Sequence, residues 1–389
     1  MSDSPARILF VHNSADIYGA SRVLLRLCGA LDRARFEPVV LLPEDGPLVQ
    51  RLKDSGIALV TQPRLSVITR RVFKSWRLIP FLLNIPLGAW QLRSIIRRYR
   101  IDLVHTNVGT ILSSALSSRL AGVPHVWHIR DWYGEFRGPW KWYRRYIFAC
   151  SEMVVCVSRA IADQFPTASK LVVVHDGFPI EEFAVDQARL RAEFRENYHI
   201  PPNSFVVSCV GRIKFVRKGQ EFLVKAAAFL RAKNVDLTIL IVGAPSPGSE
   251  NHLPRLRTLV DELGLQDRVV FTGELSDTRP AYAASDVFVL PSAQPEPFGG
   301  VVLEAMCMGK PVIATAVGGS LDQVVDGRTG YLVPPADPRA LGEKILILFR
   351  DPVLRKQMGN AGAERVRTHF NLQRMVRQLE EIYVRVLAQ

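Results

Sequence analysis

Two glutamates eight residues apart form the most informative acidic pair in the chain. Glu296 lies in a loop rich in proline and glycine, and Glu304 lies in a helix that the pattern predicts to begin near Val301. Carboxylate oxygens accept hydrogen bonds from hydroxyl groups, so one glutamate can bind a sugar and the other a ribose. For an isolated glutamate, solvation and the helix dipole are the more common explanation. The residues around this pair favour the binding role.

The backbone that leads into this helix is suited to binding an anion. Phe298, Gly299 and Gly300 complete the loop, and Val301 and Val302 begin the helix. Unpaired N–H groups at a helix N-terminus attract negative charge, and glycines allow a phosphate to approach closely. We therefore predict that these five residues contribute to a phosphate-binding site.

A second loop carries the cations that such a site needs. Arg212 and Lys218 lie between the apolar run at 205–210 and the helical pattern at 220–230. Two positive charges at the carboxyl edge of a parallel sheet can neutralise a diphosphate as it departs. Lys214 and Arg217 lie in the same loop, and we interpret them as solvated surface residues.

In their order and spacing, these motifs resemble the retaining glycosyltransferases of family 4, which have the GT-B fold. Glu296 and Glu304 form the E-x7-E element of that family. Further matches extend over most of residues 205–345. They are VFTG at 270–273, YAASDV at 282–287, PS at 291–292, GKPVIA at 309–314, GG at 318–319 and DGRTGYLVP at 326–334.

The resemblance implies roles for the residues that match. It makes Glu296 catalytic and places Glu304 on the ribose, with Arg212 and Lys218 stabilising the departing nucleotide diphosphate. The resemblance also implies a front-face reaction that retains the anomeric configuration, in which the leaving diphosphate helps to take the acceptor proton. Asp322 stands where family members usually have Glu.

The first half of the chain matches the family less fully. His128 ends an apolar run at the place of a family histidine that touches the donor sugar, which makes it a second catalytic candidate. A structural role is the alternative, as it is for His105. Gly19 keeps one of two family glycines near the donor, with Ser21 in place of a glutamate, and a simple turn is its alternative. Arg130, together with the aspartate that follows it, is a hypothetical binding site for a phosphate on the acceptor.

Short β-branched runs alternate with longer amphipathic stretches along the whole chain, which indicates βα units. Two sets of about six strands predict an α/β fold: two Rossmann-like, doubly wound parallel-sheet domains that face a central cleft, as in GT-B. We expect an acceptor-side domain at 1–178 and a donor-binding domain at 184–371. The helical pattern at 372–389 is expected to pack back onto the first domain. The expected strands are 8–11, 39–42, 103–105, 125–129, 153–157 and 171–175, then 205–210, 237–242, 268–271, 287–290, 311–314 and 330–333.

The chain of 389 residues carries 50 Lys and Arg against 37 Asp and Glu, a formal charge of +13. Most of the excess lies in residues 1–185, with 24 basic and 15 acidic residues. Basic and aromatic residues mix from Arg64 to Arg77 and from Arg137 to Tyr146, which suits an anionic membrane surface. An ordinary amphipathic helix explains each stretch equally well.

Other features restrict the compartment and the cofactors. The five cysteines are scattered and odd in number, and no apolar run reaches the length of a membrane span. We expect a cytoplasmic protein that is peripheral on the membrane face if the basic stretches bind lipid. The absence of Asp-x-Asp and of a Cys/His cluster predicts no metal and no cofactor.

The resemblance implies hexose transfer from a UDP- or GDP-sugar, such as GDP-mannose, to a saccharide, and the basic stretches add a lipid-linked saccharide as a possible acceptor. A nucleotide-sugar epimerase on the same scaffold is one alternative. A basic protein that binds nucleic acid or membranes without catalysis is another, although we expect no nucleic-acid partner. A catalytically silent subunit is a third.

Overall fold

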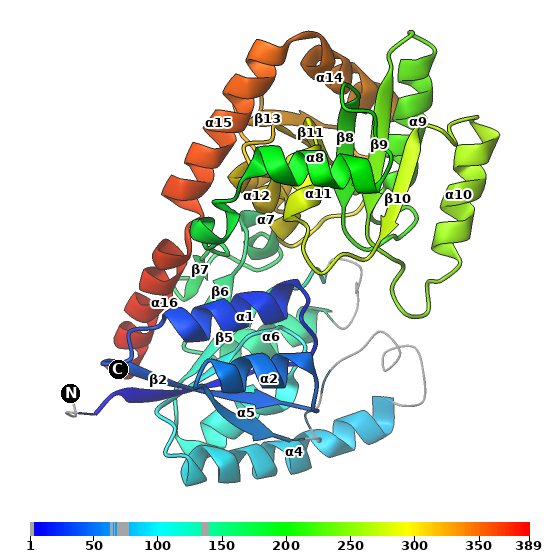
Figure 1. Ribbon diagram of the computed structural model, residues 1–389. Coiled ribbons are helices and arrows are strands. Elements are labelled where there is room, and N and C mark those ends of the chain that lie inside the picture. The colour runs from blue at the N-terminus through cyan, green and yellow to red at the C-terminus, as the bar shows by residue number, and fades with distance from the viewer. Residues whose placement is uncertain (1–3, 63–64, 66, 68–77, 134–139) are drawn as a thin grey trace. The chain divides into compact units, whose positions relative to one another are not determined.

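The computed structural model describes residues 4–62, 65, 67, 78–133 and 140–389 (Figure 1). Within these residues the chain forms two compact units, which are described separately below. Unit 1 consists of Met1–Gly177 and Leu372–Gln389, and unit 2 consists of Phe178–Asn371. Each unit is built around a parallel β-sheet.

The described strands of unit 1 form a seven-stranded parallel sheet in the order β3-β2-β1-β4-β5-β6-β7. The order reverses direction between β1 and β4, where the loops after two adjacent strands leave in opposite directions. Such a switch point is where open α/β sheets bind ligands. The strands are β1 (Ala6–Val11), β2 (Phe36–Leu42), β3 (Ala58–Thr61), β4 (Leu103–Thr106), β5 (His125–Ile129), β6 (Met153–Cys156) and β7 (Leu171–Val173).

Alternating side chains of β1 divide the core of unit 1 into two layers. Ile8 and Phe10 belong to one cluster, and Leu9 and Val11 belong to the cluster on the opposite face. Residues of α1 (Gly19–Ala30), α2 (Pro47–Asp54) and α16 (Leu372–Leu387) fill the first cluster. The second face packs against α4 (Leu78–Arg98), α5 (Leu112–Ala121) and α6 (Trp140–Ala149), and a short α7 (Arg159–Ala162) precedes β7.

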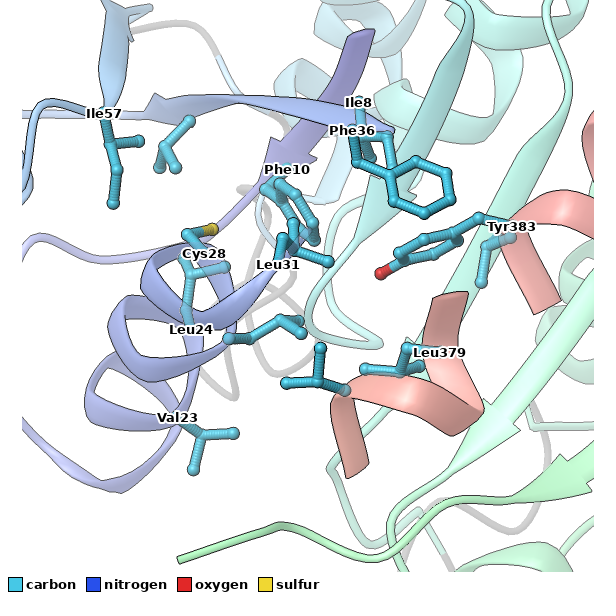
Figure 2. Packing of buried hydrophobic residues seen from close by; sticks show 14 of the residues in the cluster. Ile8, Phe10, Val23, Leu24, Cys28, Leu31, Phe36, Ile57, Leu379 and Tyr383 are labelled. Atoms are coloured by element: carbon cyan, nitrogen blue, oxygen red, sulfur yellow. The ribbon is translucent and has the colours of Figure 1, made fainter. Parts of the chain in front are cut away.

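Helix α16 belongs to unit 1 although it follows unit 2 in the chain. Tyr383 lies among the aromatic rings of Phe10 and Phe36, as Figure 2 shows. Its hydroxyl group is 2.8 Å from Nδ1 of His105 on β4. Burial of a large apolar stripe, including Leu379, holds this helix to the first sheet.

Two elements of unit 1 are not readily identified from local sequence patterns. The short edge strand β3 was missed, because its outer residues Ala58 and Thr61 are exposed and its apolar run is brief. Helix α4 continues through Pro86. A proline usually ends or kinks a helix because it lacks an N–H donor.

Unit 2 contains a six-stranded parallel sheet, within the described residues, in the order β10-β9-β8-β11-β12-β13. Its direction reverses between β8 and β11. The strands are β8 (Phe205–Val210), β9 (Leu237–Val242), β10 (Val269–Gly273), β11 (Val287–Leu290), β12 (Val312–Thr315) and β13 (Gly330–Val333). Four of the six have the bounds that the apolar runs predicted.

Helices cover both faces of the second sheet. One cluster contains residues of α9 (Gln220–Arg231), α10 (His252–Glu262) and α14 (Pro338–Arg350). The other contains residues of the remaining elements: η1 (Ile180–Phe183), α8 (Gln187–Asn197), α11 (Arg279–Ala284), α12 (Gly300–Cys307) and α15 (Pro352–His369). A short α13 (Ser320–Gln323) follows β12. The α/β fold class expected from the sequence is confirmed.

No helix in the described part of the chain is both long and apolar enough to cross a membrane. None of the five cysteines, which all lie in the described part of the chain, forms a disulfide, and three of them, Cys28, Cys156 and Cys209, are buried. Burial raises the pKa of the Cys209 thiol to about 12, so this thiol stays protonated at neutral pH.

Candidate functional site

Three loops meet at the carboxyl edge of the second sheet because they follow three neighbouring strands. Lys218 follows β8, Glu296 follows β11 and Gly318 follows β12. These strands are adjacent in the order β8-β11-β12, although β8 and β11 are not consecutive in the chain. The sheet topology therefore brings together two motifs that the sequence shows far apart.

One contact between these loops is an ion pair. Nζ of Lys218 lies 2.8 Å from Oε1 of Glu296, and both side chains are largely buried. Oγ of Ser292 donates to the same carboxylate oxygen at 3.2 Å. The backbone carbonyl of Ser292 accepts a 2.7 Å hydrogen bond from Oγ1 of Thr315 on β12. Glu296 is thus held in place by a cation and by a serine that is itself anchored.

The loop that carries Lys218 is shaped by the first two side chains of α9. Gln220 donates through Nε2 to the carbonyl of Arg212 at 3.1 Å, and Oε1 of Glu221 accepts from the Val216 N–H at 2.6 Å. Val216 has a positive φ of 64°, an unusual conformation for a β-branched residue. Burial raises the pKa of Glu221. The loop is therefore fixed by buried side chains rather than by propensity.

Glycine is required where the loops approach each other. A Cβ on Gly318, whose φ is +62°, would lie 2.2 Å from the carbonyl oxygen of Glu296. A Cβ on Gly219, whose φ is +72°, would lie 1.9 Å from the carbonyl oxygen of Pro291. The Gly319 N–H donates to the Glu296 carbonyl at 2.8 Å. The glycine turn after β12 therefore supports the backbone of Glu296.

The backbone at the start of α12 is partly paired within itself. The Gly300 N–H donates to the Phe298 carbonyl at 3.1 Å, and the Val302 N–H donates to the Gly299 carbonyl at 2.9 Å. Val301 lies between them in the first turn. Nε2 of Gln323 also donates to the Gly299 carbonyl, at 3.2 Å.

Gln323 is a member of this site that the sequence reasoning missed. Its side chain is fully buried, and its Oε1 is among the buried oxygens without a hydrogen-bond partner. Its backbone carbonyl accepts from Nε of Arg365 at 2.8 Å, which connects α13 to α15. The sequence did offer one signal for a buried polar role, since this glutamine directly precedes the apolar residue Val324.

The second glutamate of the pair is held separately, by α11. Oε2 of Glu304 accepts a 2.9 Å hydrogen bond from the hydroxyl group of Tyr282, and Oγ1 of Thr278 lies 3.5 Å from the same oxygen. Tyr282 is fully buried in the second core cluster of this unit. Its hydroxyl orients one carboxylate oxygen, and the carboxylate keeps a second oxygen for a ligand.

A buried polar network lies at the switch point of the first sheet. Nε2 of His12, after β1, is 3.0 Å from Oγ of Ser21, and its Nδ1 is 3.3 Å from Nδ2 of Asn107, after β4. Burial, with the charge of Arg130 as the second cause, lowers the pKa of His12 to about 4. The ring is therefore neutral at pH 7. Gly19 is the first residue of α1, and the space beside its Cα is open.

His128 lies inside β5 and is completely buried. Its ring centroid is 5.4 Å from that of His105, and its Nδ1 is 3.5 Å from Nη2 of Arg130. A guanidinium N–H can only donate, so Nδ1 accepts and Nε2 carries the proton. Burial first, and the charge of Arg130 second, hold the pKa of His128 well below its ordinary value.

Arg130 is engaged within unit 1. Its Nη1 is 2.5 Å from Oδ1 of Asp176, and its Nε donates to Oδ1 of Asn107 at 3.3 Å. The following aspartate, Asp131, accepts from the Gly109 N–H at 3.0 Å. These contacts give both residues structural partners and do not support the hypothesis that they bind an acceptor phosphate.

Within unit 2, the structure brings Lys218 to Glu296 and places Phe298 in the loop between Glu296 and α12. Gly299 is the N-cap of α12, and Gly300 is its first residue, one position before the expected start at Val301. Arg212 is exposed in the same loop as Lys218. Among the described residues, no group of three or more His, Cys, Asp or Glu side chains could hold a metal ion. The arrangement joins cations, a helix start and two carboxylates at one sheet edge.

Comparisons with known proteins identify the family of the chain. The model of the family "Glycosyl transferases group 1" matches residues 191–365, and the model "Glycosyltransferase Family 4" matches residues 17–182. A capsular polysaccharide biosynthesis glycosyltransferase, CapM, from Staphylococcus aureus is 31% identical over 60% of this chain and 62% of its own. A D-inositol 3-phosphate glycosyltransferase from Salinispora tropica is 34% identical over 58% of this chain and 48% of its own. The matches thus span less than two thirds of these relatives.

Solved structures match nearly the whole chain. A glycosyltransferase from Rickettsia africae superimposes with a TM-score of 0.84 and 26% identity, over 98% of this chain and 99% of its own. Anabaena HepE in complex with UDP has a TM-score of 0.83 and 24% identity, over 97% of this chain and 100% of its own. With both family models matched in order along two Rossmann-like units, the chain belongs to the family 4 glycosyltransferases of the GT-B fold.

Proposed function

We propose that this protein transfers a hexose from a UDP- or GDP-sugar to a saccharide or lipid-linked saccharide, with retention of the anomeric configuration. The observation that carries the proposal is the Lys218–Glu296 ion pair beside the start of α12. It joins a cation suited to the diphosphate with a carboxylate suited to the sugar hydroxyls. Glu304, oriented by Tyr282, is suited to the ribose.

In the proposed reaction, the bond between the anomeric carbon and the diphosphate oxygen breaks as the bond to the acceptor oxygen forms on the same face. The acceptor proton passes to the departing diphosphate. Arg212, Lys218 and the N-terminus of α12 offset the charge that develops on the leaving group. Catalysis then consists of positioning and electrostatic stabilisation. His128 and Gly19 keep their proposed roles toward the donor through the family resemblance.

The reaction is proposed to proceed without a metal ion, because the cations of the β8–α9 loop can balance the diphosphate. Saturating EDTA should leave the rate unchanged, and added Mg²⁺ should not increase it. A rate that EDTA abolishes and Mg²⁺ restores would contradict this part of the proposal.

The proposed acceptor class and location rest on less specific observations than the donor site does. The Staphylococcus aureus relative is named for capsular polysaccharide biosynthesis, which fits a saccharide acceptor. Five cysteines without a disulfide among them fit the cytoplasm. Most of the basic stretch from Arg64 to Arg77 lies outside the described residues, as does the beginning of the stretch that ends at Tyr146. The described part of the second stretch is taken up below.

Thermal unfolding against UDP, GDP, ADP and dTDP tests the donor site directly. A ligand at about 100 times its dissociation constant stabilises a protein by roughly 2.7 kcal/mol. One nucleotide should raise the unfolding temperature with or without Mg²⁺, and Arg212→Ala should remove the shift. If none of the four does so, the donor site is wrong and a silent subunit becomes the better explanation.

Product analysis separates transfer from the other activities. A transferase releases nucleoside diphosphate only with acceptor, whereas an epimerase converts the donor without acceptor and releases none in a stable cycle. The anomeric proton coupling in the product's NMR spectrum reports retention or inversion. Tight, strongly salt-dependent binding of DNA or RNA without turnover would favour a nucleic-acid-binding protein.

A further inference from the structure

Three helices on one face of the first sheet share an unusual composition. Helices α4 and α5 pack against each other, and Tyr146 of α6 donates to the Leu112 carbonyl of α5 at 2.6 Å. Trp127 of β5 packs its ring against Tyr143 and Tyr146 of α6. The three helices therefore form one layer, and Figure 1 shows α4 beside α5.

The outward side of this layer, here called the α4–α6 face, exposes large apolar side chains. On α4 the inward residues Leu92 and Ile96 fill the core, while Leu83, Leu87 and Trp90 point away from it at helical spacing. Singly exposed apolar residues are ordinary, but a group on one layer marks an interaction surface. The exposed fractions are 73% for Leu83, 40% for Leu87, 63% for Trp90, 50% for Leu120 on α5 and 71% for Trp142 on α6.

All charged residues of the same three helices are basic. Their sequences contain no Asp or Glu. Arg93 connects the apolar residues, since its Nε donates to the Leu120 carbonyl at 2.9 Å, and the guanidinium of Arg145 lies 5.4 Å from the ring centre of Trp142. The basic residues are Arg93, Arg97 and Arg98 on α4, Arg119 on α5, and Lys141, Arg144 and Arg145 on α6.

We propose that the α4–α6 face docks on a membrane surface that contains anionic lipid. Leucine and tryptophan side chains enter the boundary between headgroups and acyl chains, and arginine and lysine pair with lipid phosphates. The proposal extends the proposed function, on which it rests for the lipid-linked acceptor: docking would hold the enzyme at the surface where such an acceptor is found.

The composition argues against two other partners. A second copy of the chain that used the same face would place two sets of cations against each other, which opposes association. A nucleic acid would explain the cations but would leave Leu83 and Leu87 without apolar contact, because backbone recognition uses charge. An anionic bilayer supplies both the negative surface and the apolar layer beneath it.

The test is co-sedimentation of the full-length chain with phosphatidylcholine vesicles, alone or mixed equally with phosphatidylglycerol, in the absence of any sugar donor. The wild-type protein should pellet with the mixed vesicles and stay in solution with phosphatidylcholine alone. The double variant Leu83→Glu, Trp90→Glu should stay in solution in both cases. Arg97→Ala and Arg98→Ala should each weaken binding about fivefold, since a basic residue near an anionic surface contributes about 1 kcal/mol.

A matched control keeps the test specific. Val353 on α15 of unit 2 is 64% exposed, so Val353→Glu changes the same surface property elsewhere and should not affect vesicle binding. The double variant should keep wild-type transfer to a water-soluble acceptor, because none of its changes touches the donor site. Unchanged transfer with lost vesicle binding separates the docking proposal from the proposed function.

Four outcomes would overturn the proposal. The wild-type protein could fail to bind mixed vesicles, or the double variant could bind as well as the wild type. In the third, ultracentrifugation without lipid would show a wild-type dimer that the double variant abolishes, and neither protein would bind vesicles. In the fourth, an RNA duplex would bind the wild type and not the variant, again without binding to vesicles.

Discussion

Nζ of Lys218 and Oε1 of Glu296 lie 2.8 Å apart, although the two residues come from different loops of unit 2. The pair connects the side chain proposed for the diphosphate with the one proposed for the sugar. Removing either partner leaves the other as a largely buried charge without its counterion, which is costly. The two residues should therefore act as one unit in catalysis.

Lys218→Met and Glu296→Gln should each lower kcat/KM for the donor by about a hundredfold, the scale for removing one stabilising group. The double variant should be little worse than the worse single variant, because the two changes remove a shared interaction. Steady-state kinetics on the four proteins measure the coupling. Arg217→Met, in the same loop, is the control for lost charge and should have little effect. Losses that multiply in the double variant would show that the residues act independently.

Gln323 should position the Gly299 carbonyl at the start of α12. Gln323→Leu removes the only donor group of that side chain and should raise the donor KM by up to about tenfold, the upper range for a net hydrogen bond. Gln323→Glu should have the same effect at neutral pH, where a carboxylate cannot donate.

Burial should raise the pKa of the carboxyl group that Gln323→Glu introduces, so acidification should protonate it and bring the donor KM back toward the wild-type value. A purely structural role would give no such recovery. Gln266→Glu, at an exposed position of the same unit, controls for the added charge. A donor KM that does not change with pH in Gln323→Glu would contradict the positioning role.

Gly318→Ala should damage both stability and activity, whereas Gly327→Ala should cost only backbone strain. Both glycines have positive φ, +62° and +72°, so alanine at either costs about 1–2 kcal/mol. A Cβ at Gly327 meets nothing within 4 Å, but at Gly318 it would clash with the Glu296 carbonyl. The clash should add roughly 1–3 kcal/mol. Urea unfolding and kcat/KM of both variants measure this difference. Equal losses in the two variants would show that the Glu296 loop moves to make room for the added Cβ.

Unit 1 should lose stability as the pH falls from about 7 to about 4. Burial lowers the pKa of His12 to about 4 and that of His125 to about 3, from 6.5. Between the folded and unfolded pKa values the unfolded chain binds more protons, so acidification favours unfolding. Each pKa unit corresponds to about 1.4 kcal/mol, which gives roughly 3 kcal/mol for His12 as an upper value.

Urea unfolding followed by probes in unit 1 measures this dependence. His12→Asn should make the stability less sensitive to pH, even if it lowers the stability at neutral pH. His369→Asn, at an exposed position in unit 2, should leave the dependence unchanged. A His12→Asn protein with the wild-type pH dependence would show that this histidine is not the source.

Local patterns in the sequence determined most of the elements and the family. Strands such as β8 and β11 are short apolar runs buried on both faces, so their bounds could be identified without knowing their neighbours. The glutamate pair and the cationic loop were identifiable for the same reason, since spacing along the chain carries them. The edge strand β3 was missed because its outer residues are exposed and its apolar run is short.

The contacts of the site were decided by tertiary structure. Lys218 meets Glu296 because β8 lies beside β11, an adjacency that follows from the crossover connections and not from chain order. Gln323 reaches Gly299, and Tyr383 reaches His105, for the same kind of reason. The sequence by itself determined which groups can do chemistry and on which element each lies. Only the packing of sheets and helices decided which groups meet and which are buried, because those distances depend on residues far apart in the chain.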